Sequence, residues 1–583
     1  MSQDTLRAAD PVLGRLADAI LIPPFPDATA PGWILRALGR GLGGVTLFGQ
    51  NIVTPGQVSA LTAELRAAAA DHDPVIAIDE EGGDVTRVAY TDGSPYPGNA
   101  ALGVVDDVLL TQAVHRAIGL DLAALGINFN LAPCADVLGA ADSPAVGTRS
   151  FGADTALVSR HTAAAVTGLQ SAGVAACAKH FPGHGRTGTD SHDAIATIEG
   201  SLAELRLVDL PPFEAAIKAG TIGVMPSHLR VPELTGDLPA SVSVAAIVGL
   251  LRGELGFTGV IVSDALEMRA VRDLFGIPGA AVLAVAAGTD LLCLGRQGGE
   301  AEYLAVRDAL VAAVRDGELD GARLEEAADR VARLRGGLAR ARLSGLAASA
   351  SAAIPGGAVL NITEPDITGP DITGPDVTGP DVTDRVITDP DYPGGESTGL
   401  GVGLVAARRA VQASGPHRTL DRPVIVEVEP RENIAAGQFG WGLGPWVAPG
   451  SVHRVSPSGQ PVGIGPGDDD AGDAVAGGAV AGGAGDAGLG GGGAGEAAGL
   501  GDDAVAGILA AADGRSLVVA VRDAHRDEQT LALVRALLAA RPDLVLVEMG
   551  LPFWHPPAGT AYLATYGASR ASAHAAAELL GLA

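Results

Sequence analysis

The amino-acid sequence predicts an α/β protein whose first block, residues 1–345, is a (β/α)8 barrel. Three observations lead to this fold. Eight short apolar runs recur along the block, and helical patterns of ten or more residues separate them. Polar side chains follow several of the runs directly, which is typical of the carboxyl ends of barrel strands. Strict alternation of strands with helices favours a parallel sheet, and eight repeats are the number that closes a barrel.

The predicted strands are, in order, 18–22, 44–48, 75–78, 127–131, 174–178, 223–226, 259–263 and 291–294. Between them, Ala, Leu and Arg at helical spacing predict helices at 55–70, 111–125 and 156–171, and a charged amphipathic helix at 323–342 closes the block. A doubly wound open sheet is the alternative, although no GxGxxG phosphate loop opens its first crossover.

Two acidic segments divide the rest of the chain. The predicted linker, 346–398, contains PDITG and PDVTG repeats whose prolines exclude helix and central strand. A Gly/Ala/Asp-rich insert at 464–507 lies inside the second block, 399–583, and has too little apolar surface to order itself, so it is predicted to be disordered. Residues 361–396 and 464–507 each carry a net charge of −8, so together they supply −16 of the −29 of the whole chain.

Composition excludes several classes of function. With 39 Lys+Arg against 68 Asp+Glu, the chain is not expected to bind nucleic acid or a membrane surface. No run of about 20 uncharged apolar residues occurs. Three cysteines cannot form a disulfide framework, and the N-terminal stretch lacks the pattern of a secretory signal, so a cytoplasmic location is expected.

Polar residues at the ends of predicted strands indicate an active site. Asp79, Lys179, His180, His228 and Asp264 all occupy such positions. In a barrel these ends converge on one face, where catalytic sites are built.

The densest cluster is AKHFPGHGRTGTDSHDA, residues 178–194, which contains Lys179, His180, Asp190 and His192. Lys179 is one of only two lysines, which favours a specific need for a compact ammonium group. Three alternatives stay open for this loop: a zinc site at His180, His184 and His192, a serine nucleophile at Ser191, and a purely structural loop. His184, between two glycines, is expected to shape the loop.

Two further clusters complete the candidate site. In GVIVSDALEM (259–268), Asp264 is either a carboxylate nucleophile or a helix N-cap, and Glu267 is expected to face elsewhere. In IDEEGGDVTR (78–87), Asp79 can accept bonds from vicinal hydroxyls and Arg87 can donate to them, whereas Glu80 and Glu81 form a competing acid/base pair. Arg149 is either another donor or part of a structural ion pair.

Together these motifs closely resemble family 3 glycoside hydrolases, in their β-N-acetylglucosaminidase branch. The resemblance rests on LFGQN (47–51), DEEGG…R (79–87), GINFNLAPCADV (126–137), GTRSFG (147–152), KHFPGHG…DSH (179–192) and SDALEM (263–268). The second block resembles the α/β sandwich domain of two-domain members, through stretches such as 433–444 and 544–554. The resemblance thus implies a TIM-like barrel followed by a C-terminal α/β sandwich.

The resemblance also implies residue roles. Asp264 would be the nucleophile and His192 the general acid/base, assisted by Asp190. Sugar contacts would come from Asp79, Arg87, Arg149, Lys179 and His180, and no metal or cofactor is expected. Arg186 stands where relatives often carry Asp, and would add positive charge on the acceptor side.

The implied activity is that of a retaining, exo-acting β-N-acetylglucosaminidase, which releases terminal N-acetylglucosamine (GlcNAc) from muropeptide or chitin fragments. A carboxylate nucleophile and a separate proton donor are the groups that retaining hydrolysis needs, and a histidine reaches both protonation states near neutrality. Three alternatives remain: a phosphorylase with phosphate as acceptor, a β-glucosidase or xylosidase, and a sugar-binding protein without turnover.

Overall fold

The computed structural model describes residues 3–69, 72–139, 143–188, 195–352, 398–430, 440–462 and 502–583. The chain forms two compact units. The first comprises Met1–Ala410, Asn433–Gly440 and Ser569–Ser572, and the second comprises Val411–Glu432, Trp441–Ala568 and Ala573–Ala583.

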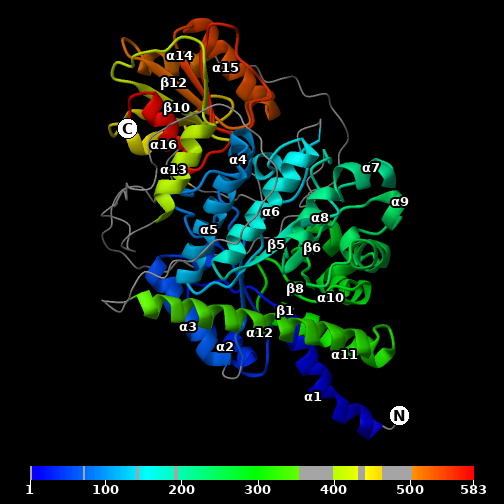
Figure 1. Ribbon diagram of the computed structural model, residues 1–583. Coiled ribbons are helices and arrows are strands. Elements are labelled where there is room, and N and C mark those ends of the chain that lie inside the picture. The colour runs from blue at the N-terminus through cyan, green and yellow to red at the C-terminus, as the bar shows by residue number, and fades with distance from the viewer. Residues whose placement is uncertain are drawn as a thin grey trace, which may run out of the picture. The chain divides into compact units, whose positions relative to one another are not determined.

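Eight parallel strands form the centre of the first unit (Figure 1). They are β1 (Leu21–Ile22), β2 (Gly44–Leu47), β3 (Val75–Ile78), β4 (Phe129–Asn130), β5 (Ala175–Phe181), β6 (Gly223–Pro226), β7 (Val260–Ile261) and β8 (Leu292–Cys293). Each strand overlaps one of the eight predicted runs. The predicted fold class is therefore confirmed for this unit.

The strands close on themselves. Strands β2 to β7 pair in chain order, and β1 pairs with β8. A parallel bridge between Val262 and Leu291 joins the ends of β7 and β8. On the other side, Thr46 of β2 donates its hydroxyl to the Ile22 carbonyl of β1 at 3.1 Å. These contacts complete a (β/α)8 ring, so the carboxyl ends of all eight strands lie at one end of the barrel.

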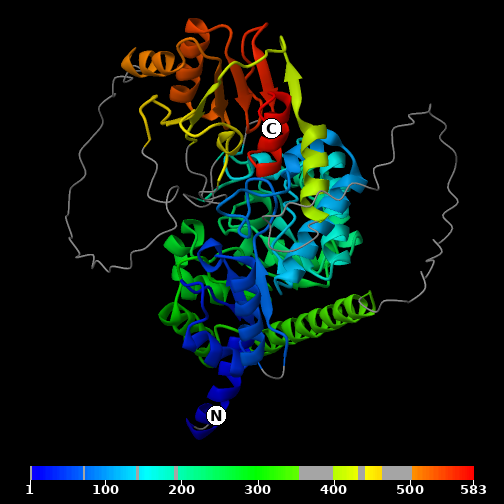
Figure 2. The ribbon, with the colours of Figure 1, turned by 90° about the vertical axis from the view of Figure 1, so that its left-hand side faces the viewer.

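Helices surround the strands and bury their outer faces (Figure 2). The α-helices are α1 (Gln3–Ala19), α2 (Gly32–Gly39), α3 (Pro55–Ala69), α4 (Asn99–Val105), α5 (Val108–Ala124), α6 (Thr155–Ser171), α7 (Leu202–Val208), α8 (Pro211–Lys218), α9 (Pro232–Thr235), α10 (Arg269–Ala287), α11 (Glu300–Asp316), α12 (Gly321–Ala352) and α13 (Thr398–Ala410). Short 3-10 helices span Gly49–Asn51, Gly147–Arg149 and Ala240–Val242, and a π-helix spans Ala245–Glu254.

Side-chain caps set several helix starts. The Asp107 carboxylate accepts the N–H groups of Leu109 and Leu110 at the start of α5, and Asp154 caps α6 in the same way. These caps satisfy donors that the first turn of a helix cannot pair internally. The two helices pack on one another and bury a continuous apolar stripe in the barrel core.

The ends of the first block differ from the prediction. Helix α12 continues to Ala352, past the predicted linker start at residue 346. Residues 353–397, which include the repeats, lie outside the described residues. Helix α13 packs on α4 and α5, and Arg409 pairs with Asp107 at 2.7 Å. The sequence assigns this helix to the second block, whereas its packing and its ion pair tie it to the barrel unit.

The second unit is built on one mixed sheet in the order β11-β10-β12-β13-β14-β9, in which only β9 runs antiparallel. The strands are β9 (Gln412–Ser414), β10 (Val424–Val428), β11 (Val452–Val455), β12 (Leu517–Val521), β13 (Val545–Glu548) and β14 (Ala561–Ala564). Helices α14 (Asp502–Ala511) and α15 (Glu528–Ala540) share an apolar core with one face of the sheet, and α16 (Arg570–Leu579) lies across from them (Figures 1 and 2). A 3-10 turn spans Gly444–Trp446 and another spans Ala524–Arg526. This is the α/β domain that the sequence resemblance implies.

One boundary in this unit is wrong. The predicted disordered insert runs to residue 507, but residues 502–507 belong to α14. Val505, inside the segment, and Ile508 and Leu509, just past it, recur at helical spacing and pack into the second core, so the apolar period of this helix runs across the predicted boundary. The preceding residues, 463–501, lie outside the described part of the chain.

Helix α10 is the one described single helix that is long and apolar enough to cross a membrane by length and composition. Its buried residues, among them Ala280, Ala284 and Val285, belong to the barrel core.

Candidate functional site

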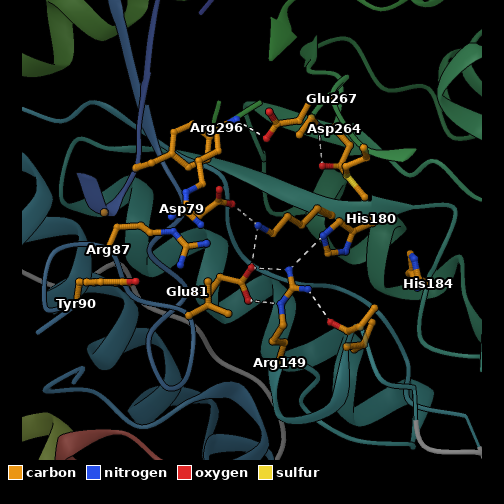
Figure 3. Close-up of a pocket in the computed structure, with 18 of the residues that line it drawn as sticks. Asp79, Glu81, Arg87, Tyr90, Arg149, His180, His184, Asp264, Glu267 and Arg296 are labelled. Carbon is orange, nitrogen blue, oxygen red and sulfur yellow. Dashed lines mark hydrogen bonds and ion pairs between the residues drawn. The ribbon is translucent and has the colours of Figure 1, made fainter. Parts of the chain in front are cut away.

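A pocket of about 360 Å³ opens at the carboxyl ends of the barrel strands. Its walls come from the loops after β2, β3, β4, β5, β7 and β8. All six sugar-site or nucleophile candidates that fall within the described residues line it: Asp79, Arg87, Arg149, Lys179, His180 and Asp264. Figure 3 shows Asp264 on one side of the pocket and Arg149 on the other. Its volume is in the range of small-molecule sites.

A network of ion pairs forms the floor of the pocket (Figure 3). The Lys179 ammonium lies 2.6 Å from Asp79 Oδ1 and 2.8 Å from Glu81 Oε1. Arg149 donates Nη2 and Nε to the two oxygens of Glu81 at 2.7 and 2.9 Å. Glu81 is therefore the carboxylate that joins the two cations, and it ties residues from the loops after β3 and β4 to Lys179 of β5.

Glu81, Lys179 and Arg149 remain ionised in this network although they are buried. Burial by itself would raise the pKa of Glu81, but Arg149 and Lys179 outweigh it and hold that pKa well below its usual range. Burial acts against the Lys179 and Arg149 cations too, yet their carboxylate partners raise the pKa of both. A permanently ionised Glu81 is a poor proton donor.

The competing acid/base pair at Glu80 and Glu81 therefore fails on geometry. Glu80 is buried, and its carboxylate accepts the backbone N–H groups of Arg87 and Val88 at 2.7 and 3.0 Å. Burial raises the pKa of Glu80, but its oxygens are committed to the turn that carries Arg87 into the pocket. Glu80 shapes the loop, and Glu81 holds the floor.

The network leaves bonding capacity for a substrate. Lys179 has three N–H donors and uses two of them. No described group donates to the second carboxylate oxygen of Asp79, whose side chain is 19% exposed. A donor and an acceptor side by side suit the vicinal hydroxyls of a sugar.

His180 is held in one tautomer. Arg149 Nη2 lies 3.2 Å from His180 Nε2, and a guanidinium N–H can only donate, so Nε2 accepts. The ring proton is then on Nδ1, which donates to Asp136 Oδ2 at 2.7 Å. Both ring nitrogens are thereby used, and His180 presents its ring to the pocket in a fixed orientation.

Asp136 organises this side of the site from beneath. It is fully buried, and its Oδ1 accepts the backbone N–H groups of His180 and His184 at 3.2 and 2.7 Å. Burial would raise the pKa of Asp136, but its contact with His180, through which Nδ1–H donates to the carboxylate, outweighs burial and holds that pKa well below the usual range. His184 is anchored through its backbone N–H, and its side chain lines the pocket.

Lys179 and His180 both line the pocket although they are neighbours in a strand. Regular alternation would turn one of them to the opposite face. The register of β5 against β6 shifts between Lys179 and Phe181, and such irregularities re-aim side chains. Both groups can then face the pocket.

Asp264 follows β7 and does not cap a helix, because α10 begins at Arg269 with Met268 as its N-cap. Its Oδ1 accepts the N–H of Ala265 at 2.8 Å. His228 Nε2 donates to the Ala265 carbonyl at 3.1 Å, and Ser241 bonds the other ring nitrogen at 2.7 Å. The buried His228 therefore supports the loop that carries Asp264.

Two sequence-based expectations need correction. Glu267 does not face away: it lines the pocket, and its carboxylate accepts the backbone N–H groups of Arg296 and Gln297. Arg186 does not add charge to the site, because its guanidinium is paired with the buried carboxylate of Asp209 at 2.7 Å. In both cases a distant loop supplies the partner, which local sequence does not reveal.

Asp190 and His192 lie outside the described residues. The structure therefore places the predicted nucleophile and the sugar-binding candidates, while the predicted acid/base dyad stays a prediction.

Among the described residues, one group could hold a metal ion. Cys134, Asp136 and His180 bring potential ligand atoms within 4.8 Å of one another. The Cys134 thiol donates to Asp136 at 3.1 Å, and burial raises its pKa well above the usual range. These residues satisfy one another by hydrogen bonding, and a metal would have to displace both the thiol proton and the His180 proton.

Sequence reasoning did not assign Glu81 and Asp136 their structural roles. The sequence suggests only an acid/base role for Glu81, although this residue stands three residues beyond the end of a strand. Asp136 lies inside the quoted stretch 126–137 but five residues past its predicted strand. Searching a few residues beyond each strand for buried acids would have found both.

Comparison with known proteins identifies the class of protein that this barrel and site define. Residues 34–334 match the glycosyl hydrolase family 3 N-terminal domain, and the chain belongs to that family of glycoside hydrolases. The resemblance seen in the sequence is thereby confirmed.

Two relatives are similar to this chain over a little under half of its length. A β-hexosaminidase A of Pseudoalteromonas piscicida is 34% identical over 284 residues, which are 45% of this chain and 47% of that protein. The β-hexosaminidase LpqI of Mycobacterium tuberculosis is 38% identical over 47% of this chain and 71% of its own length. The chain thus matches less than half of the first relative.

A solved structure resembles both units. The glycoside hydrolase family 3 β-N-acetylglucosaminidase from Paenibacillus sp. str. FPU-7 has a TM-score of 0.73 at 28% identity, over 98% of this chain and 97% of that one. The two-part α/β architecture is therefore shared along nearly the whole chain.

Proposed function

We propose that the protein is a retaining, exo-acting β-N-acetylglucosaminidase that releases terminal β-linked GlcNAc from small glycosides such as muropeptide or chitin fragments. The observation that carries the proposal is the placement of a carboxylate, Asp264, across the pocket from a floor of candidate sugar-binding groups. The names of the relatives, β-hexosaminidases and a β-N-acetylglucosaminidase, support the choice of sugar.

The terminal sugar occupies the floor. Asp79 and Lys179 bond its ring hydroxyls, Arg149 and Arg87 donate from two further loops, and the ring of His180 packs beside them. Because the Lys179 and Arg149 side chains are only 3% and 8% exposed, the floor is closed, and a closed floor accepts a chain end and excludes an internal unit. This geometry supports exo cleavage.

The reaction runs in two displacements. Asp264 attacks the anomeric carbon, a C–O bond to the enzyme forms, and the bond to the leaving oxygen breaks as that oxygen takes a proton from His192. A water molecule then gives its proton to His192 and attacks the same carbon, which releases GlcNAc and regenerates the Asp264 carboxylate. Asp190 orients His192 and favours its charged form.

The test is hydrolysis of a chromogenic β-GlcNAc glycoside by the full chain, with the corresponding β-glucoside as comparison. We expect turnover of the GlcNAc glycoside and its loss, by at least about 10³-fold, in Asp264→Asn. Preference for the glucoside, or full activity in Asp264→Asn, would contradict the proposal. Formation of GlcNAc 1-phosphate in phosphate buffer would change the acceptor from water to phosphate.

His192→Ala examines the proton donor separately. It should lower kcat/KM, which reports the first displacement, far more for a substrate with a poor leaving group than for the nitrophenyl glycoside, because only the poor leaving group needs protonation. Equal effects on both substrates would contradict the assigned role. The three cysteines are free in the structure, and a cytoplasmic location stays our prediction.

A further inference from the structure

At the mouth of the pocket, Arg296 is a cation that the network on the floor does not neutralise. Arg149 and Lys179 are both paired with buried carboxylates. Arg296, on the loop after β8, is exposed and lines the same pocket. Its guanidinium has one partner among the described residues, the neutral side-chain oxygen of Gln50, which accepts from Nε at 3.3 Å.

Hydrogen bonds hold both the backbone and the Nε atom of Arg296 in place. Gln50 makes two hydrogen bonds to Arg296, because its amide nitrogen also donates to the Arg296 carbonyl at 3.0 Å. The Glu267 carboxylate accepts the backbone N–H groups of Arg296 and Gln297. Gly295, with φ of 115°, makes this approach possible, because a Cβ there would lie 2.3 Å from the Glu267 carboxyl carbon. Most exposed arginines move freely, whereas this one is anchored at its backbone and at Nε.

The anchored guanidinium of Arg296 presents a fork of two donor nitrogens. Nη1 and Nη2 of Arg296 have no hydrogen-bond acceptor among the described residues. A planar guanidinium fork matches the two oxygens of a carboxylate or phosphate, and bonds of this kind are stronger than neutral ones. The chemistry that fits is an oxyanion.

The position of the fork says which part of a ligand it meets. Glu267, which fixes Arg296, belongs to the same loop as Asp264 (Figure 3). The terminal sugar fills the buried floor, so the part of the substrate beyond the cleaved bond must extend toward the exposed mouth. Arg296 therefore faces the leaving group or the acceptor.

We infer that Arg296, clamped by Gln50 and Glu267, forms a site for an oxyanion just beyond the cleaved bond. The inference rests on the proposed function. Two sources share this chemistry: a carboxylate on the sugar that leaves, as in a muramic acid residue, and free inorganic phosphate. Neutral chitin fragments would not use the site.

Two disaccharides and one variant distinguish these sources. The full chain is assayed on GlcNAc-β-1,4-N-acetylmuramic acid, which carries a carboxylate next to the cleaved bond, and on neutral chitobiose. For a carboxylate ligand, the ratio of kcat/KM between the two substrates should fall about tenfold or more in Arg296→Gln. Arg296→Lys should give an intermediate ratio, because it retains the charge without the fork. Arg36→Gln, on an exposed arginine of helix α2, is the matched control and should leave the ratio unchanged.

The second arm adds inorganic phosphate to the chitobiose assay. For a phosphate ligand, phosphate should raise turnover and yield GlcNAc 1-phosphate in the wild type and much less in Arg296→Gln, with no change in the substrate ratio. A ratio and a phosphate response that are both independent of Arg296 would overturn this inference while GlcNAc release continues. Failure of the wild type to cleave either disaccharide would overturn the proposed function itself.

Discussion

Replacing Glu81 by Gln tests whether the ion-pair network holds the site together. The substitution preserves the shape of the side chain but removes the charge that Arg149 and Lys179 share. Glu81 accepts three charge-assisted bonds, at 2.7, 2.8 and 2.9 Å, and is 4% exposed. A glutamine can keep one oxygen acceptor, and its NH2 group must then face an arginine or lysine donor.

The expected cost follows from these contacts. Breaking one side of a buried ion pair typically destabilises a protein by about 3–5 kcal/mol. Lys179 retains Asp79, and Arg149 retains the Ala145 carbonyl and His180, so we expect the lower end, about 3 kcal/mol of unfolding free energy. Loss of alignment in both cations should reduce kcat/KM by about 100-fold or more.

The effect should also depend on pH with a defined sign. The folded-state pKa of Glu81 lies below the ordinary value of 4.5, so its stabilisation is present above that value and is lost as pH falls through the lower folded-state pKa. The difference between wild type and Glu81→Gln should therefore be full at neutral pH and shrink under acid conditions.

Urea denaturation followed by far-UV circular dichroism measures the stability difference, and the chromogenic assay measures kcat/KM. Glu325→Gln, an exposed position on helix α12, is the control and should change neither quantity. A stability loss below about 1 kcal/mol together with an unchanged kcat/KM would refute the reasoning, since a buried, threefold-bonded carboxylate should not be dispensable.

Two further substitutions test other buried acids. Asp136→Asn should place an amide N–H against Nδ1 of His180 and force the ring proton onto Nε2, opposite an Arg149 donor. We expect kcat/KM for the chromogenic substrate to fall at least about tenfold in this variant. The control Cys134→Ala removes only the thiol bond to Asp136 and should remain active. Equal losses in both variants would contradict the tautomer argument. In the second unit, burial and then the nearby Asp523 raise the pKa of Glu548 to about 8. The folded state therefore binds the Glu548 proton more tightly than the unfolded chain does. The free energy of unfolding should decrease as pH rises from about 4.5 to about 8, by roughly 1.4 kcal/mol per pH unit and about 4–5 kcal/mol in all. Urea denaturation followed by tryptophan fluorescence reports mainly this unit, because the unit holds three of the four tryptophans. The urea midpoint should fall with rising pH in the wild type and fall less steeply in Glu548→Gln. Identical pH dependences would contradict the raised pKa of Glu548.

The barrel could be predicted because its signals are local. Each strand is a short apolar run with a polar residue at its end, and helices such as α3 and α6 show their period within one segment. The same rule located Asp79, Lys179 and Asp264, since a parallel ring must bring strand ends to one face. The boundary at residue 507 failed for a local reason too, because it cuts an apolar helical period that starts at Val505 inside the segment and continues at Ile508 and Leu509 beyond it.

The roles of the charged groups could not be predicted in this way. Arg149 and Glu81 are 68 residues apart, and His180 and Asp136 are 44 apart. Nothing near Arg186 in the sequence shows that Asp209 will neutralise it. Which carboxylate meets which cation depends on how neighbouring loops pack above the strands.

The sequence by itself determined the strands and helices, the face on which they would meet, and the types of side chain available there. Only the tertiary structure decided that Glu81 and Asp136 hold the site together and that Glu267 turns inward. It also decided that Arg296 presents, at the mouth, a guanidinium fork with no acceptor among the described residues. The physical reason is the distance along the chain over which each signal acts. Apolar periodicity acts over a few residues along the chain, whereas the state of a charged group is set through space by whichever loops surround it.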